Sequence, residues 1–225
     1  MIRCDELKTG IGLLIVFVLA ASAASAQSGD QDTGKQLVQE FVSDVITLEG
    51  RFEQSLIDAE GRVVEESSGT LEIRRPGQFR WSYLDPYEQW LVADGLNIWS
   101  YDVDLAQVTV KPQAEALSNT PALLLGGSAD ALTQFDYNGS FVEDNTTWVR
   151  LSPKNTDSGF ARVDLGFTDH VLSRMVFFDT LDQTTLVALH DVSVNEPIDA
   201  GRFAFAVPDD VDLVGIPAIA EVTDP

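Results

Sequence analysis

Apolar and polar positions alternate over most of the chain, and the stretch LEIRRPGQFRW at residues 71–81 shows the pattern clearly. Leu71 and Ile73 alternate with polar residues, as in a strand with one buried face. An Arg-Arg-Pro-Gly segment interrupts the alternation, and Phe79 and Trp81 then resume it with aromatic side chains. The stretch therefore predicts two strands joined by a tight turn that carries two arginines.

Similar period-two segments, separated by turn signals such as Pro-Gly and Asp-Gly, predict further strands between residues 51 and 111 and between residues 135 and 206. The last of them is expected at residues 203–206. Short turns between successive strands indicate an antiparallel meander. A single sheet of about eleven strands is expected to roll up or close, because it is too large to stay open and flat.

Two segments depart from the alternation. Residues 36–48 carry apolar side chains at helical spacing and predict an amphipathic helix. Residues 114–132 interrupt the strands with a short leucine-rich helix that begins at Pro121 and is ended by two glycines. So little helix cannot cover both faces of a large sheet. We therefore predict a mainly β fold, a single antiparallel sheet rolled into an unclosed barrel, with short helices forming a lid and a plug.

The first 26 residues have the pattern of an export signal. An apolar run at residues 11–20 is followed by small residues that end at Ala26. The run is too short for a membrane span, which needs about 20 residues. Cleavage would remove Cys4, the single cysteine, and leave no disulfide. We expect a cleaved signal at residues 1–26, one domain at residues 27–225 and a periplasmic location.

The net charge of −22 argues against nucleic acid as a partner, because phosphate binding needs a basic surface. The two histidines, His170 and His190, do not have the spacing of metal ligands. The chain also has no G-x-S-x-G nucleophile motif and no phosphate-binding glycine loop. We therefore expect no enzyme activity, no metal and no cofactor.

The aromatic residues and the arginine pair suggest a different kind of site. Phe79, Trp81 and Tyr83 share one face of a predicted strand. Such a stripe is commonly core, but beneath a leucine-bearing lid it would line a pocket for an apolar ligand. Arg75 has five donors and could bond the free carbonyls at the end of a short lid helix. The alternative is a surface arginine paired with an acidic neighbour.

Ordered motifs extend across nearly all of the chain beyond the export signal. They are RFEQS at 51–55, SSGTLEIRRPGQFRW at 67–81, DPYEQWLVADGLNIWSYD at 85–102, QVTV at 107–110, NTPALLL at 119–125 and FAFAVPDDV at 203–211. Together they resemble the periplasmic outer-membrane lipoprotein carrier family, LolA.

The resemblance implies an unclosed β-barrel whose hydrophobic cavity holds the acyl chains of a lipoprotein. A chaperone of this family takes lipoproteins from an inner-membrane ABC transporter of the LolCDE type and delivers them to an outer-membrane acceptor of the LolB type. We expect it to act as a monomer. Arg75 matches the arginine that holds the lid of the family, and Arg74 is its expected solvent-facing neighbour. The lid would contain Pro121, Leu123, Leu124 and Leu125. The residues expected to contact acyl chains are Phe52, Leu71, Ile73, Phe79, Trp81, Tyr83, Trp99 and Tyr101.

Two other functions remain open from the sequence. One is a sensor-type module of the same fold that binds lipoprotein or peptide signals for an envelope-stress regulator. The other is a lipid hydrolase, which would need a nucleophile and base that the motifs do not supply.

The lid sequence ALLLGG also differs from the family in lacking an aromatic residue.

Overall fold

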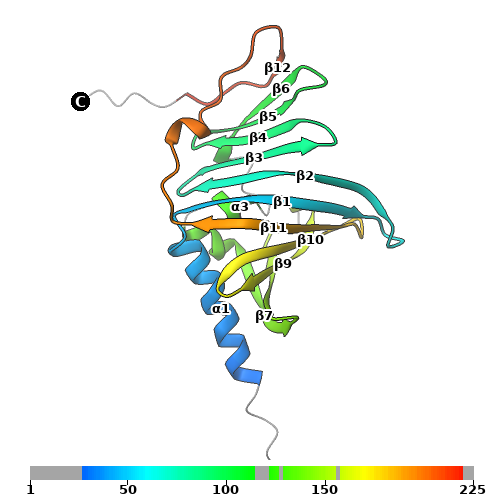
Figure 1. Cartoon of the computed structure of the whole chain (residues 1–225), viewed down its shortest axis with the longest axis vertical. Helices are drawn as coiled ribbons and strands as arrows, with labels where there is room; N and C mark the ends of the chain where they lie inside the picture. Colours follow the sequence, from blue (N-terminus) through cyan, green and yellow to red (C-terminus); the bar gives the residue numbers. More distant parts are fainter. Residues whose placement is uncertain (1–26, 115–121, 127–128, 156–157, 220–225) are drawn as a thin grey trace, which may run out of the picture.

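Twelve strands form one sheet in the computed structural model, which describes residues 27–114, 122–126, 129–155 and 158–219 (Figure 1). Their spatial order is β12-β6-β5-β4-β3-β2-β1-β11-β10-β9-β8-β7. Since the two end strands, β12 and β7, do not pair with each other, the predicted unclosed sheet is confirmed. The strands are β1 Thr47–Ile57, β2 Val63–Arg74, β3 Gln78–Asp85, β4 Gln89–Asp94, β5 Asn97–Asp102, β6 Gln107–Pro112, β7 Phe135–Glu143, β8 Thr146–Pro153, β9 Phe160–Thr168, β10 Val171–Asp179, β11 Thr184–Val194 and β12 Asp212–Val214.

Neighbouring strands pair antiparallel, as predicted, with one exception. The short β12 pairs parallel with β6, with Asp212 opposite Gln107. Before it reaches this edge, the chain crosses the outer face of the sheet, where Phe205, Val207 and Val211 pack against a cluster from β4, β5 and β6. Because the chain crosses the sheet between β11 and β12 instead of making a hairpin turn, its last strand can lie parallel to its neighbour.

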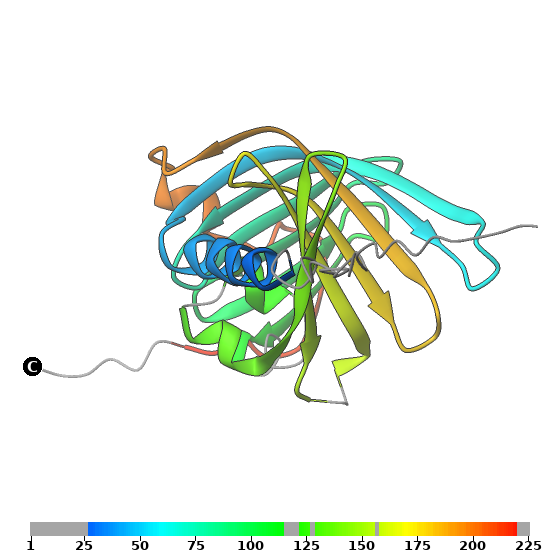
Figure 2. The same cartoon turned by 90° about the horizontal axis from the view of Figure 1, so that it is seen from below.

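The helix α1 (Gln27–Ser43) lies within the curl of the sheet, as Figure 2 shows. Leu37, Val38, Phe41 and Val42 are each at most 5% exposed and join a core built from β1 to β4 and β7 to β11. Complete burial of a large apolar side chain is worth about 1.5–3 kcal/mol. The inner face of the sheet is therefore packed against the apolar face of this helix.

The helix was predicted at residues 36–48, but it ends at Ser43, and β1 begins four residues later. Backbone groups of the intervening residues bond to distant parts of the chain instead of continuing the helix. The Ile46 amide donates to Asn195 Oδ1 at 2.8 Å, and Asn195 Nδ2 donates to the Asp44 carbonyl at 3.1 Å. These long-range bonds favour an early helix end that sequence periodicity does not reveal.

The strand predicted at residues 203–206 is wrong. Phe203 ends the short 3-10 helix η3 (Ala200–Phe203), and the next residues run outside the sheet. Asp199 begins this helix by accepting a 2.6 Å hydrogen bond from the Gly201 amide. Arg202 forms an ion pair with Glu72, which is 3% exposed on the outer face of β2. Capping and an ion pair to a buried carboxylate thus override the alternation of FAFA.

The insertion between β6 and β7 is helical, as predicted. It contains α3 (Ala122–Gly126) and the 3-10 helix η1 (Ala129–Gln134) in its described part. Leu124 and Leu125 are buried, which places α3 against the sheet. Among the described residues, no helix has the length and apolar character needed to cross a membrane.

Candidate binding site

The inner face of the sheet carries a continuous apolar surface on three adjacent strands. Phe52 comes from β1, Leu71 and Ile73 from β2, and Phe79 and Trp81 from β3, and none is more than 7% exposed. Residue register explains the grouping, because Leu71 lies opposite Trp81 and Ile73 opposite Phe79 in the β2–β3 pair. Paired residues point to the same face of a sheet.

The aromatic rings of this surface contact one another. Phe52 lies edge-on to Trp81 and to Tyr83, at 5.1 Å between ring centroids in each case, and Trp81 stacks on Tyr83 at 6.2 Å. A Cβ at Gly69 would lie 2.9 Å from Phe52 Cε1 and 1.8 Å from the Ser82 carbonyl oxygen. Glycine is therefore required at this position for the ring and the neighbouring strand to approach so closely.

Trp99 and Tyr101, predicted to line the same surface, lie on the opposite face. Trp99 is paired with Val92, and both belong to the outer cluster beneath Phe205. The Trp99 and Phe205 rings stack at 5.2 Å, and Tyr101 meets Phe205 edge-on at 6.1 Å. The prediction was wrong because similar aromatic spacing on two strands does not specify the same face. The pairing registers of β4, which lies between β3 and β5, decide on which face Trp99 and Tyr101 lie.

Arg75 is buried at the end of β2, with 7% of its surface exposed, so the alternative of a surface arginine is wrong. Its Nη1 donates to the Val45 carbonyl at 2.9 Å, and its Nη2 donates to the Leu124 carbonyl at 2.8 Å. The guanidinium carbon lies 4.6 Å from the centroid of the Phe41 ring. Arg75 thus connects α1, the segment after it, and α3.

Burial lowers the pKa of Arg75 to about 10, so its side chain stays charged at neutral pH. Its two bonds to carbonyls are therefore charge-assisted. The neighbouring Arg74, expected to face solvent, is half-buried and donates from Nη1 to Gln78 Oε1 at 3.2 Å. The two adjacent arginines consequently make different contacts, and the bond to α3 comes from Arg75.

A second hydrogen bond and close packing also attach α3. The Gly77 amide donates to the Gly126 carbonyl at 2.7 Å. A Cβ at Gly126 would lie 2.7 Å from Phe79 Cδ1, so the absence of a side chain lets the helix end lie on that ring. Of the predicted lid residues, Leu124 and Leu125 are 1% and 2% exposed in the core. Pro121 and the side chain of Leu123 fall outside the described part.

A pocket of about 560 Å³ opens beside α1, between that helix, η1 and the β7–β8 edge. Its size lies within the range of about 300–1,000 Å³ typical of small-molecule sites. Much of its lining is apolar, namely Val38, Val42, Leu132, Phe135, Tyr137 and Leu151. The sequence pattern did not predict this pocket, although the amphipathic spacing of the helix placed two of its apolar residues on one face.

The described residues contain no group of three or more histidine, cysteine or carboxylate side chains arranged to hold a metal ion. Both histidines are exposed and lie near single carboxylates. His170 Nδ1 is 3.7 Å from Glu40 Oε2, and His190 Nε2 is 3.5 Å from Glu53 Oε2. Neither histidine belongs to the apolar core of the inner face.

By its fold and site, this protein is of the class in which an unclosed β-sheet curls around a helix. Its apolar inner face, with a small helix attached over it, is the candidate surface for a ligand. Residues 43–206 match the family model described as outer membrane lipoprotein carrier protein LolA. The match covers more than half of the chain, which therefore belongs to this family.

Curated relatives extend the match to most of the chain. The outer-membrane lipoprotein carrier protein of Chromobacterium violaceum is 38% identical over 90% of this chain and 97% of its own length. That of Nitrosomonas europaea is 34% identical over 89% of this chain and 98% of its own length. At the level of fold alone, an uncharacterized conserved protein from Thermus thermophilus has a TM-score of 0.50 and 16% identity, over 84% of this chain and 99% of that protein.

Proposed function

We propose that this protein is a periplasmic chaperone that binds the acyl chains of lipoproteins released from the inner membrane and delivers them to the outer membrane. One observation carries the proposal: α3 lies over the apolar inner face of an unclosed sheet and is attached by few polar contacts, a bond from buried Arg75 to the Leu124 carbonyl and one from the Gly77 amide to the Gly126 carbonyl. Such an interior can open without unfolding the sheet. Family membership supports the same function.

The cargo requires a carrier because its acyl chains are strongly apolar. Each buried CH₂ is worth about 0.8 kcal/mol, so free acyl chains do not remain in water. In the proposed complex, the chains lie between α3 and the sheet and contact Phe52, Leu71, Ile73, Phe79, Trp81 and Tyr83. The outer-face positions of Trp99 and Tyr101 remove these two from the proposed site.

Arg75 has the role of holding the lid in the empty protein. A lid that closes over the site in the absence of cargo lowers the apparent affinity, because part of the binding energy is spent on opening it. Moderate affinity suits a carrier that must release its cargo to an acceptor. The proposed lid residues are Leu124 and Leu125 together with their neighbours in sequence, Leu123 and Pro121.

The proposed route begins and ends at a membrane. A signal at residues 1–26 would direct the chain to the periplasm, where it would act as a monomer and without catalysis. It would receive acylated lipoproteins from an inner-membrane ABC transporter of the LolCDE type. An outer-membrane acceptor of the LolB type would take them over.

The direct test incubates the purified chain, without residues 1–26, with spheroplasts that hold a labelled lipoprotein in the inner membrane. We expect the lipoprotein to appear in the soluble fraction as a one-to-one complex with this chain. The Arg75→Leu chain, which lacks the hydrogen bond to the Leu124 carbonyl, serves as a comparison for release and onward transfer. Absence of release, with an active transporter and a folded chain, would refute the carrier function.

A further inference from the structure

The inner face of the sheet changes from apolar to polar toward one end of its strands. Ile73, Phe79 and Ala93 lie near the end that α3 covers. Strand β3 runs away from this end, from Phe79 through Trp81 to Tyr83. At the far end, the next inner positions of the neighbouring strands are polar. They are Gln54 on β1, Ser67 on β2, Gln89 on β4 and Asp102 on β5.

These polar residues line a second pocket of about 430 Å³ at the end of the sheet where the β1–β2, β3–β4 and β5–β6 turns lie. These turns share one side of the sheet in Figure 1. Tyr83 joins the pocket to the apolar surface, since its ring contacts Phe52 and Trp81 while its hydroxyl donates to Gln54 Oε1 at 3.2 Å. An amphiphilic ligand with its chains on the aromatic rings would therefore present its polar head to this pocket.

A buried polar atom in the pocket lacks a partner among the described residues. Ser67 is 8% exposed, and its Oγ makes no hydrogen bond. An unpaired buried hydroxyl costs free energy unless a ligand or water satisfies it. Ser67 lies opposite Gln54, whose Oε1 already accepts a hydrogen bond from Tyr83. The pocket thus contains a polar group that a bound head group would satisfy.

The charge of the pocket is negative. Its lining includes Glu65, Asp102 and Asp104 but neither lysine nor arginine. Asp102 Oδ1 accepts a 3.0 Å hydrogen bond from the Leu105 amide, which does not neutralise the carboxylate. Desolvation is the larger cause that raises the pKa of the Tyr83 hydroxyl, and Coulombic repulsion from Glu65 raises this pKa further.

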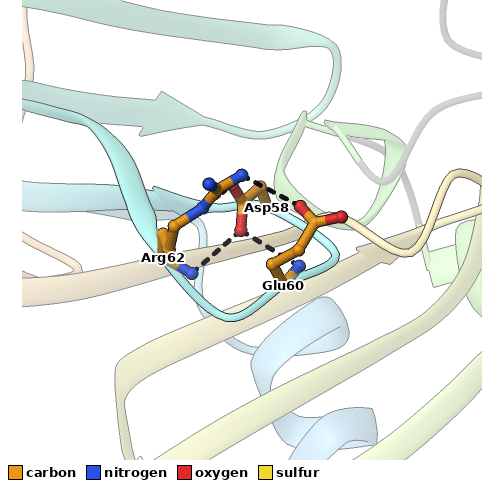
Figure 3. A network of polar contacts seen from close by, with 3 residues as sticks. All are labelled: Asp58, Glu60 and Arg62. Atoms are coloured by element: carbon orange, nitrogen blue, oxygen red, sulfur yellow. Dashed lines mark hydrogen bonds and ion pairs between the residues drawn. The ribbon is translucent and has the colours of Figure 1, made fainter.

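The arginine nearest in sequence to these carboxylates is engaged elsewhere. Arg62, in the β1–β2 turn, bonds Asp58 at 2.6 Å and Glu60 at 3.1 Å (Figure 3). The Asp58 carboxylate also accepts hydrogen bonds from the backbone amides of Glu60 and Arg62. This network fixes the turn and leaves the pocket carboxylates without this cation.

We infer that the pocket binds a cationic, hydrogen-bond-donating head group of the acylated ligand, an ammonium group close to the acyl chains. The inference rests on the proposed carrier function and adds a preference among cargoes. An ammonium group matches the site because the pocket offers three carboxylates and amide and hydroxyl acceptors within reach of the aromatic surface. An anionic head would meet like charge instead.

The test uses synthetic lipopeptides with an S-diacylglyceryl cysteine at the N-terminus. The first carries Ser-Lys-Lys-Lys-Lys after the cysteine, the second replaces the lysines by glutamates, and the third keeps the lysines but has an acetylated α-amine. We expect the lysine probe to bind about tenfold more tightly than the glutamate probe at low salt, which is the scale of several partly exposed ion pairs. The acetylated probe distinguishes the α-ammonium group from lysine side chains as the source of the preference.

The double variant Glu65→Gln, Asp102→Asn should reduce this preference to near unity without weakening the glutamate probe. Glu66→Gln is the matched control, because Glu66 lies opposite Ser55 and is exposed on the other face of the same strand. Equal binding of the lysine and glutamate probes by the native chain would overturn the head-group inference and leave the carrier function standing. Failure of all three probes to bind would overturn both.

Discussion

Replacing Arg75 by methionine tests how α3 is held. Methionine keeps an unbranched side chain but removes the Nη2 donor that reaches the Leu124 carbonyl at 2.8 Å. A hydrogen bond from a charged group contributes about 1.5–3 kcal/mol, and each 1.4 kcal/mol is a tenfold change in an equilibrium constant. We therefore expect the equilibrium for detachment of α3 to shift about 10- to 100-fold toward the open state.

Amide hydrogen exchange at Gly77 reports this detachment, because its N–H donates to the Gly126 carbonyl at the end of α3. Protection of Gly77 should fall by the same factor in the Arg75→Met chain, after correction for any change in global stability measured at Val163 in the core. Arg74→Met is the matched control, since Arg74 bonds only to Gln78 among the hydrogen bonds described for it. Equal protection of Gly77 in the two variants would refute the reasoning.

The same attachment has a consequence for transport. With a looser lid, less of the binding energy is spent on opening, so Arg75→Leu should hold lipoprotein more tightly and pass it on poorly. The measurement is the fraction of a labelled lipoprotein that moves from the preformed complex to outer-membrane vesicles. Transfer at the native rate would show that Arg75 does not control the lid.

Three further outcomes follow from the packing. Gly126→Ala should destabilise the chain by about 1–3 kcal/mol in urea unfolding, because the added methyl would overlap the Phe79 ring, and an unchanged midpoint would contradict this. Trp81 faces the proposed site and Trp99 lies on the outer face. Adding a lipopeptide should therefore change tryptophan emission in the Trp99→Phe chain but not in the Trp81→Phe chain. The reverse result would exclude the inner face as the binding surface. Burial raises the pKa of Tyr83 to about 12, above its ordinary value of 10. The native chain should therefore lose stability relative to Tyr83→Phe as pH rises from 10 to about 12, and parallel unfolding curves across that window would contradict the pKa shift.

Several features of this protein follow from local sequence alone. Strict period-two alternation specified most strands, and β2 and β5 have the bounds that the pattern predicted. The Pro-Gly turn after Arg75 placed a donor-rich side chain at a strand end. Such features are predictable because side-chain alternation and turn chemistry depend on residues close together in the chain.

Other features depended on contacts between distant residues. The face on which Trp99 lies is set by the register of β4 against β3 and β5, which alternation within one strand does not specify. The end of α1 depends on Asn195, about 150 residues further along the chain.

The arginine pair illustrates the division between sequence and tertiary structure. The sequence determined that a donor-rich turn and a leucine-rich helical segment exist, since both arise from neighbouring residues. The family resemblance pointed to Arg75 as the arginine that holds the lid, but only the tertiary structure decided that its bond goes to the Leu124 carbonyl, that Arg74 bonds Gln78 instead of facing solvent, and that the inner face ends in an acidic pocket. Strand pairing and the curl of the sheet bring these groups together, and pairing is decided by the whole chain.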